Sequence, residues 1–464
     1  VRLLISALLF IKLKVLLSQT TFSETIDFNG NQESAYTTIQ YDNYIYLMGN
    51  GLLVDDGYKK GLFFCKTDLL GNVVWHRTFV DDSSTLSSGF NALVDQSGII
   101  YITGGCTNET LGETNAFLCS IDPFNGDTLK FYEFNTPGFE AGLRIEWMPD
   151  STILIYGTKT VTGYGKILLM NVDTLGNIIF NKYYGTGIVR NSRYFQLDDN
   201  GSISIAFGDE DCDPRGYTFH SIDMLGNIVS TTHADENCLE WGVPSLSDDG
   251  YYIAGYEYYI YTLTFLAKLN NDFSYTWKNY FEPDGVYLLW AQHELMDGSV
   301  IVYGSKLNEG YSEHAFIRKI DASGNTIWER EYYTEQDLYP NYIWDISETP
   351  EGDLICVGTA FAEPLMETGF LSQNFWLLRL DSLGCIETGC DTIGNENPSH
   401  IFNFPAISIY PNPLINEGAI QINLDLVDIN NVTYFEIELR DIAGHILEEF
   451  TIDHFHWKIT NNKI

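Results

Sequence analysis

The sequence predicts an all-β repeat protein, and three observations support this fold class. Aromatic residues make up 14% of the 464 residues, with 30 Tyr and 28 Phe, and such residues favour strands. Short apolar runs end repeatedly in tight turns rich in Asp, Gly and Asn. One turn phrase, Asp-x-x-Gly-Asn followed by an apolar strand, returns along most of the chain.

Two independent phrases recur with the same period. The turn phrase starts at seven positions that lie 47 to 60 residues apart: Asp68, Asp122, Asp173, Asp223, Asn270, Asp321 and Asp381. The second phrase is an apolar strand that ends in glycine, at Gly49, Gly104, Gly157, Gly208, Gly255, Gly304 and Gly358. Their joint recurrence predicts seven copies of one structural unit.

Each unit contains four strand-like runs. Around Asp321 they are WAQHELM, VIVYG, HAFIRKI and TIWEREYY, joined by short Asp-Gly and Asp-x-x-Gly-Asn turns and by one variable loop. Asp and Asn accept local hydrogen bonds and Gly tolerates positive φ, so these turns predict hairpins. Four antiparallel strands repeated seven times are typical of a seven-bladed β-propeller, which we predict for residues 21–390.

The repeat also predicts how the units pack and how the ring closes. Trp75, Phe180 and Trp328 each stand three residues after the turn Asn, and aromatics at a fixed strand position indicate packing between neighbouring units. The last unit has little strand after its turn, whereas residues 21–28 form a strand-like run with no unit before it. We therefore expect this N-terminal strand to complete the seventh unit, which also removes exposed edges.

The first twenty residues predict export. Residues 1–20 combine a basic Arg2, an apolar run and small or polar residues near their end, which is typical of a signal peptide. The run is short and interrupted by Lys12 and Lys14, so we expect no membrane span in the mature chain. The formal net charge of −38 favours solubility and repels nucleic acid, which we exclude as a partner.

A change of composition marks a second domain. A linker rich in Pro and Asn is expected at 391–406, and residues 407–464 carry two motifs, Tyr410, Pro411, Asn412 and Pro413, then Asp441 to Gly444. This pair resembles the type A C-terminal sorting domain of the type IX secretion system. The resemblance implies a small β-sandwich, secretion or display on the outer cell surface, and the outer-membrane secretion machinery as a partner. The chain ends FTIDHFHWKITNNKI, without the terminal strands of such domains, so we expect an incomplete domain.

Few residues predict bound ions or disulfides. Asp209, Asp211 and Asp213 have the alternate spacing of calcium loops, but Pro214 occupies the usual glycine position, so a solvated acidic loop is the alternative. Cys212 with Cys238, and Cys385 with Cys390, are candidate disulfides in an exported protein; Cys106 and Cys119 could also pair. No Cys/His spacing predicts zinc, and we expect no cofactor.

No catalytic motif is present. The chain contains no supported Gly-x-Ser-x-Gly, His-Glu-x-x-His or P-loop pattern, so no catalytic residue is predicted. We expect a monomeric binding or scaffold module. Two alternatives stay open: an enzyme that acts on polysaccharide through carboxylates, Tyr or His at the channel mouth, and a quinone-dependent dehydrogenase with stacking Trp residues. Convergence of carboxylates, His and Tyr from several units would favour an enzyme.

The two ends of the repeat unit predict different roles. Short, repetitive turns belong to one face, and the second-to-third strand loops, which vary in sequence, belong to the other, where recognition usually resides. The variable face carries many aromatics, among them Trp241, Tyr258 and Tyr287. Flat rings beside acids suit sugars, so we predict a glycan or protein ligand there.

Overall fold

The computed structural model describes most of the predicted repeat region and four short strands of the C-terminal part. The described residues are 10–14, 21–28, 32–53, 59–81, 84–108, 110–135, 138–161, 164–185, 189–190, 195–197, 201–209, 216–235, 239–247, 250–258, 262–270, 274–281, 286–307, 313–334, 339–364, 371–386, 390, 407–410, 421–424, 434–440 and 446–453. The chain divides into a larger unit, residues 21–386 and 390–397, and a smaller unit, residues 1–20, 387–389 and 398–464. Within the described residues, no helix is long and apolar enough to cross a membrane.

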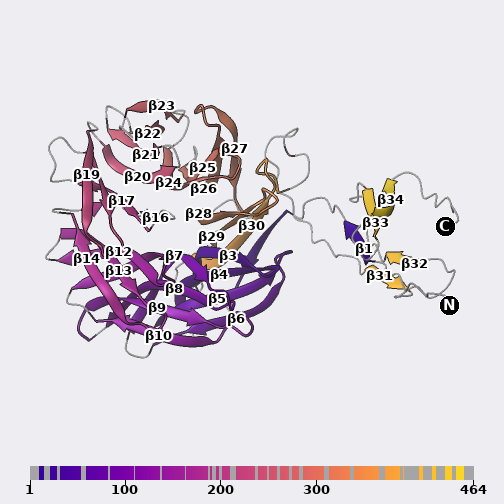
Figure 1. Ribbon diagram of the computed structural model, residues 1–464, viewed down its shortest axis with the longest axis horizontal. Coiled ribbons are helices and arrows are strands. Elements are labelled where there is room, and N and C mark those ends of the chain that lie inside the picture. Colours follow the sequence, from indigo (N-terminus) through magenta and orange to yellow (C-terminus); the bar gives the residue numbers. More distant parts are fainter. Residues whose placement is uncertain are drawn as a thin grey trace, which may run out of the picture. The chain divides into compact units, whose positions relative to one another are not determined.

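The larger unit is built of antiparallel sheets with the strand order that the repeat predicts (Figure 1). The first three sheets are β3 (Gln32–Tyr41), β4 (Tyr44–Leu53), β5 (Lys59–Asp68) and β6 (Val73–Phe79); β7 (Ser84–Val94), β8 (Ile100–Asn108), β9 (Glu113–Ile121) and β10 (Thr128–Phe134); and β11 (Phe139–Trp147), β12 (Ile153–Val161), β13 (Tyr164–Val172) and β14 (Ile178–Tyr184). A single parallel bridge from Phe139 to Thr114 links the second of these sheets to the third.

The following sheets repeat the pattern. They are β15 (Val189–Arg190) and β16 (Phe195–Leu197), which share one edge, with β17 (Ile203–Asp209), β18 (Gly216–Ile222) and β19 (Ile228–Asp235); β20 (Leu239–Ser247), β21 (Gly250–Tyr258), β22 (Thr262–Leu269) and β23 (Tyr275–Tyr280); and β24 (Val286–Glu294), β25 (Val300–Leu307), β26 (Glu313–Ile320) and β27 (Thr326–Tyr332). The predicted all-β fold with four-stranded antiparallel sheets is confirmed.

The last sheet combines the two ends of the repeat region. It has the order β2 (Phe22–Ile26), β30 (Leu371–Leu380), β29 (Leu354–Pro364) and β28 (Asn341–Glu348). Strand β2 pairs antiparallel with β30 over five residues, from Phe22 opposite Arg379 to Ile26 opposite Phe375. The expectation that the N-terminal strand joins the last unit is therefore met.

Apolar cores lie between successive sheets rather than within one sheet. Each cluster of buried side chains draws on two neighbouring sheets, as in the cluster that joins Leu154 and Tyr156 of β12 to Ile203 and Ile205 of β17. One cluster joins the first sheet to the last, because Phe63 of β5 packs with Phe375 of β30. Burial of these faces supplies the main stabilisation of the larger unit.

The repeated turn is held by one hydrogen-bond pattern. In the turn that starts at Asp321, Oδ1 accepts hydrogen bonds from the backbone N–H groups of Ser323 at 2.9 Å and Asn325 at 2.8 Å, and Oδ2 accepts one from Asn325 Nδ2 at 3.0 Å. The same three bonds recur in the turns at Asp68, Asp173 and Asp223. Gly324 adopts a φ of 90°, which an L side chain rarely adopts.

The turn glycine is also where the preceding sheet packs. A Cβ on Gly384 would meet the Trp328 ring at 2.8 Å, and one on Gly126 would meet the Trp75 ring at 2.6 Å. The Trp328 indole N–H donates to Ser382 O at 3.2 Å. Trp75, Trp328 and, in the same way, Phe180 therefore pack between sheets, as the sequence predicts. The recurrence of the turn thus reflects both chain reversal and sheet docking.

The second repeated glycine lies opposite a β-bulge. Strand β11 shifts register between Gly142 and Arg144, directly opposite Gly157 of β12. A Cβ on Gly157 would lie 2.0 Å from Ala141 O. Equivalent approaches of 1.8 to 1.9 Å occur at four other repeat glycines, Gly49, Gly104, Gly304 and Gly358. The glycine recurs because the bulged first strand leaves no room for a side chain.

Glu33 of β3 is a buried carboxyl where the first sheet meets the last. Its side chain is 0% exposed, and the Phe28 N–H donates to Oε1 at 3.2 Å. Desolvation and then the charge of Asp27 raise its pKa from 4.5 to about 8, against weaker backbone hydrogen bonds. Between pH 4.5 and 8 the folded state consequently binds more protons than the unfolded state, so stability falls as the pH rises.

We expect Glu33→Gln, which cannot ionise, to be more stable than the parent at pH 8.5 by about 2 kcal/mol. The advantage should shrink as the pH falls to 4.5, because the parent carboxyl is then protonated in the folded state. Thermal unfolding followed by circular dichroism at both pH values measures the difference. An advantage independent of pH would point to packing instead of charge.

The smaller unit contains two described sheets. Strand β1 (Phe10–Lys14) pairs antiparallel with β33 (Tyr434–Arg440), which pairs with β34 (Ile446–Asp453), and β31 (Ile407–Tyr410) pairs with β32 (Gln421–Leu424). Tyr410 of the YPNP motif ends β31. Pro411, Asn412, Pro413, Asp441 and Gly444, like the predicted linker 391–406, lie outside the described residues.

Candidate functional site

The strand order gives the larger unit two chemically different ends. First-to-second and third-to-fourth connections share one end, which we call the turn end; second-to-third loops and the links between sheets share the other, the loop end. The second-to-third loops differ in length from sheet to sheet, from two residues at 162–163 to six at 210–215 and 365–370. The three-bond pattern of the turn end does not recur in the described parts of these loops, although Asn108 Oδ1 accepts the N–H groups of Thr110 and Leu111 in the loop between β8 and β9, both at 3.0 Å.

Of the three residues predicted to bind a ligand, the structure describes the side chain of one, Tyr287. Tyr287 of β24 is only 2% exposed, and its hydroxyl donates to Glu329 Oε1 at 3.1 Å. Its ring packs against Phe281 and Phe316 with centroid distances of 5.2 and 5.0 Å, so Tyr287 stabilises the seam between two sheets. The side chains of Trp241 and Tyr258 lie outside the described part of the structure, and their role stays a prediction.

An ionic network occupies the loop end of the sheet β24–β27. Lys306 Nζ contacts Glu331 Oε1 at 2.9 Å, and His314 Nδ1 lies 3.0 Å from the other oxygen of Glu331. His314 also stacks on Tyr333 with ring centroids 4.5 Å apart. Burial opposes the charge of Lys306, but the hydrogen bond to Glu331 outweighs it, so the pKa of Lys306 is raised. The network therefore keeps these charged side chains paired and fixed in position.

A smaller version of this network lies at the loop end of β11–β14. Lys159 Nζ contacts Glu140 Oε1 at 2.5 Å, and the Tyr183 hydroxyl donates to the same oxygen at 2.7 Å. The Glu140 side chain is 0% exposed. A buried pair of this kind fixes geometry more than it adds stability, so both networks hold the strands from which the variable loops emerge.

The first strands of the sheets meet around the middle of the larger unit. Strand β3 contacts β7 and β28, β7 contacts β11, β16 contacts β20, and β24 contacts both β20 and β28; β28 also reaches β7 (Figure 1). Asp345 of β28 accepts hydrogen bonds at Oδ2 from the Thr37 hydroxyl and the Thr38 N–H of β3, both at 3.1 Å. A carboxylate thus joins two of these strands.

The charge of Arg144 acts on two groups from other sheets in this region, His293 and Asp345, and we call these three residues the axial cluster. Protein surrounds the partly exposed Asp345, and desolvation raises its pKa to about 7, against the nearby charge of Arg144 and its hydrogen bonds. The His293 side chain has an exposed surface, but many protein atoms surround its ring. This desolvation, and then the nearby charge of Arg144, lowers the pKa of His293. Arg144 belongs to β11, so its charge reaches two strands of non-neighbouring sheets.

The sequence did not single out the axial cluster. Arg144 and Asp345 each follow the bulged residue of a first strand, and Thr37 holds the equivalent position in β3. An alignment of the first strands on the repeat glycine would have brought these three polar residues together, but β24 has Ala291 at this position and His293 two residues later. Without such an alignment, a single charged residue in so acidic a chain does not indicate a functional site.

The metal and remaining cysteine predictions have separate outcomes. No group of three or more His, Cys, Asp or Glu able to hold a metal occurs among the described residues; the candidate calcium ligands Asp211 and Asp213 and the side chain of Asp209 lie outside them. Cys212 and Cys238 lie outside as well. Cys106 and Cys119 are free, buried thiols, so the suggested pairing is wrong: Cys106 lies opposite Asn115 and Cys119 opposite Ile102 in the ladder.

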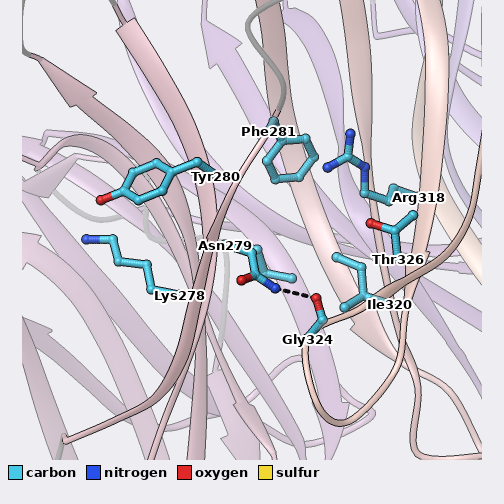
Figure 2. A pocket seen from close by; sticks show the side chains of 9 residues that line it. Lys278, Asn279, Tyr280, Phe281, Arg318, Ile320, Gly324 and Thr326 are labelled. Atoms are coloured by element: carbon cyan, nitrogen blue, oxygen red, sulfur yellow. Dashed lines mark hydrogen bonds between the residues drawn. The ribbon is translucent and has the colours of Figure 1, made fainter.

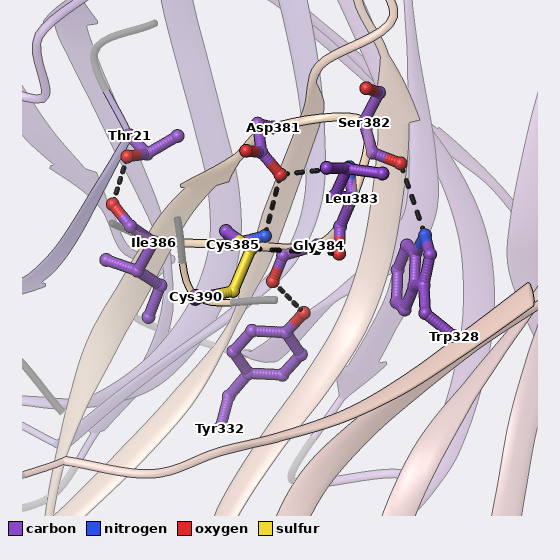
Figure 3. Close-up of a disulfide and its surroundings, with 10 residues drawn as sticks. All are labelled: Thr21, Trp328, Tyr332, Asp381, Ser382, Leu383, Gly384, Cys385, Ile386 and Cys390. Carbon is purple, nitrogen blue, oxygen red and sulfur yellow. Dashed lines mark hydrogen bonds between the residues drawn. A yellow bond between two sulfur atoms is a disulfide. The ribbon is translucent and has the colours of Figure 1, made fainter. Parts of the chain in front are cut away.

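The Cys385–Cys390 disulfide forms as the sequence predicts, with a Cα–Cα distance of 5.7 Å. Figure 3 shows it beside the last repeated turn, where Asp381 Oδ1 accepts the Cys385 N–H at 2.8 Å. The Tyr332 hydroxyl donates to Gly384 O at 2.7 Å, and the Thr21 hydroxyl donates to Ile386 O. The disulfide thus closes the chain segment to which β2 and the preceding sheet are tied.

We expect Cys390→Ala to lower the free energy of unfolding by about 2 kcal/mol, because the disulfide restricts only a short loop of the unfolded chain. Urea unfolding measures the loss. The parent treated with a reductant provides the control and should lose the same amount. A loss in the variant without a loss in the reduced parent would mean that the alanine, not the missing bond, destabilises the protein.

Comparisons with known proteins found matches among solved structures alone. No protein-family model matches the chain, and no curated protein matches it. Among solved structures it is similar to the β-propeller domain of the Trilobed protease from Pyrococcus furiosus (11% identity, TM-score 0.44, 80% of this chain and 99% of that chain). It is also similar to the polysaccharide lyase Uly1 (9%, 0.44, 75% and 90%) and the α-L-arabinofuranosidase Arb93A from Fusarium graminearum (9%, 0.41, 66% and 95%). These TM-scores carry no argument about function. The chain is an all-β protein of four-stranded antiparallel sheets with β-propellers among its structural neighbours.

Proposed function

We propose that this chain is a seven-bladed β-propeller that serves as a binding and scaffold module. The sheet order, the apolar cluster between the first and last sheets, and β2 in the last sheet support a closed ring of seven blades. The observation that carries the binding role is the contrast between the two ends. The turn end is occupied by aromatic rings docked on turn glycines, whereas the loop end presents connections of unequal length on strands held by ionic networks.

The proposed ligand is a glycan or a protein recognised at the loop end. Variable loops on a rigid repeat are suited to recognition, and Trp241 and Tyr258 are the candidate contacts. Tyr287 is left out of this set because its ring is buried.

A glycan and polysaccharide array with the full chain identifies the ligand, and titration measures its affinity. We expect Trp241→Ala and Tyr258→Ala to weaken binding at least tenfold. Leu175→Ala is the matched control, because Leu175 is 61% exposed on a turn at the opposite end. Binding that is lost in the control but kept in both loop-end variants would overturn the assignment of the face.

An enzyme that acts on polysaccharide is the second candidate, and the axial cluster is the observation that favours it. A carboxyl with a pKa near 7 can exchange a proton at neutral pH, and a neighbouring guanidinium can stabilise developing negative charge. Product analysis after incubation with polysaccharides tests this candidate. Cleavage by the parent but not by Asp345→Asn would support it, and no cleavage of any array hit would leave the binding role alone.

We propose export through the type IX secretion system, with residues 407–464 as the sorting domain and the protein secreted or held at the outer cell surface. The YPNP motif and the Asp441 to Gly444 turn support this proposal. A reporter placed between residues 1–20 and residues 405–464 of this chain, in a type IX-secreting bacterium, tests it. The reporter should reach the surface or medium, and Pro411→Ala with Pro413→Ala should retain it inside; equal export of both fusions would contradict the proposal.

A further inference from the structure

The pocket between the sheets β20–β23 and β24–β27 is closed by side chains that dock the two sheets. Figure 2 shows Asn279 beside Gly324, whose carbonyl oxygen accepts a hydrogen bond from Asn279 Nδ2. The apolar residues of its lining, Leu266, Phe281 and Ile320, are 0 to 4% exposed. A ligand would have to displace this packing, so the pocket is part of the core.

Strand β33 of the smaller unit has an edge that only β1 covers among the described strands. The sheet has the order β1–β33–β34, so β1 pairs with the edge of β33 that β34 leaves open. The pairing is antiparallel and covers five residues, from Phe10 opposite Arg440 to Lys14 opposite Glu436 (Figure 1). Removal of residues 1–20 as a signal peptide would take β1 away and leave this edge able to accept another strand.

Basic residues of β1 stand opposite acidic residues of β33. Lys12 lies opposite Glu438, and Lys14 lies opposite Glu436. Opposite charges directly across two strands favour pairing. Glu438 also lies opposite Glu449 of β34, and like charges in that position disfavour pairing. This face of β33 therefore favours a cationic neighbour on its other side.

The residues between these charges are apolar in both strands. Ile11 lies opposite Leu439. Leu13 lies opposite Ile437, which in turn lies opposite Phe450 of β34. Because successive residues of a strand belong to opposite faces, the apolar residues share one face of the sheet, and the Lys and Glu residues share the other. The strand that fits the β33 edge therefore alternates apolar and basic residues.

We propose that the β33 edge is a strand-binding site whose partner, once residues 1–20 are removed, is an extended protein segment that alternates apolar and basic residues. Strand β1 shows which strand the edge accepts, and it occupies the edge before removal. The partner segment pairs its backbone with β33 and places its basic residues opposite Glu436 and Glu438. The inference rests on the proposed sorting role, because that role makes a protein of the secretion machinery the source of the segment.

Fluorescence anisotropy tests the edge without export. The probe is a labelled peptide with the sequence of residues 9–15, titrated with the chain that starts at Thr21 and with the full chain. The shorter chain should bind it, and the full chain should bind it at least tenfold more weakly, because β1 covers the edge. A peptide with Glu in place of Lys12 and Lys14 should bind the shorter chain at least fivefold more weakly.

Two controls separate strand pairing from general attraction between a cationic peptide and an acidic chain. A peptide of the same composition with the two Lys side by side should bind at least fivefold more weakly, because it cannot place both opposite acids. Glu436→Lys with Glu438→Lys in the shorter chain should reverse the preference, so that the Glu peptide binds better than the Lys peptide. The comparison of peptides needs no variant, so it stands even where this double variant does not fold.

Disulfide trapping in the full chain tests the register independently. Lys12→Cys with Glu438→Cys should cross-link under mild oxidation, because directly opposite residues are close enough for a disulfide. Leu13→Cys with Glu438→Cys, which is one residue out of register, should not. Cross-linking of both pairs or of neither would overturn the pairing.

Three binding results would overturn the proposal: the shorter chain does not bind the Lys peptide, it binds all three peptides equally, or the full chain binds the Lys peptide as well as the shorter chain does. Failure of the reporter fusion to be exported, with charge-selective peptide binding intact, would reject the sorting role and keep the strand-binding edge.

Discussion

Removal of residues 21–28 is expected to prevent the larger unit from folding. These residues supply β2, whose five paired positions protect the edge of β30, and they bury Ile26 and Phe28 between the first and last sheets. The Phe28 ring makes edge contacts with Phe63 and Phe375 at centroid distances of 5.3 and 4.9 Å. Loss of a buried Phe alone costs about 3 to 5 kcal/mol, and a domain of this kind has about 5 to 15 kcal/mol in total.

Expression followed by size-exclusion chromatography and circular dichroism measures the outcome, which should be aggregated or unfolded protein because the edge of β30 is exposed. Phe28→Ala is the milder test and should stay folded with a stability loss of about 3 to 5 kcal/mol. Thr25→Ala is the matched control, because Thr25 is exposed on the same strand. A soluble, cooperatively folding protein without residues 21–28 would show that β2 is dispensable.

The sequence predicted the strands and their order because the repeated Asp-x-x-Gly-Asn phrase marks both a chain reversal and a position where neighbouring sheets pack. Asp321, Gly324 and Asn325 mark a hairpin through local hydrogen bonds, which need no knowledge of the rest of the chain. The packing of Trp328 between neighbouring sheets could also be predicted, since an aromatic residue recurs three residues after the turn Asn of its own unit. The pairing of β2 with β30 followed from counting strands, not from any property of residues 21–28 alone.

The candidate sites were less predictable because they depend on residues far apart in the chain. Arg144, His293 and Asp345 come from three different first strands, and the charge of Arg144 acts on the other two only once those strands meet. Tyr287 was expected at a binding face because aromatics near loops often bind ligands. Its burial depends on Phe281 and Phe316 from two other strands, contacts that sequence spacing does not reveal.

Replacement of the repeat glycine Gly157 by alanine is expected to destabilise the larger unit by more than about 3 kcal/mol. The added Cβ would stand 2.0 Å from Ala141 O and 2.9 Å from its carbonyl carbon, and both belong to backbone that cannot rotate away. Strand β11 cannot retreat easily, because Asn91 of the neighbouring sheet exchanges two hydrogen bonds with Ile145, both at 2.7 Å. The bulge between Gly142 and Arg144 must therefore be lost or the sheet pair must separate, and either change also displaces Arg144. Urea unfolding measures the effect, with Thr158→Ala on the same strand as the control, which should cost less than about 1 kcal/mol. Equal stability of the two variants would mean that the bulge relaxes around a methyl group, and the recurrence of glycine opposite each bulge would then need another explanation.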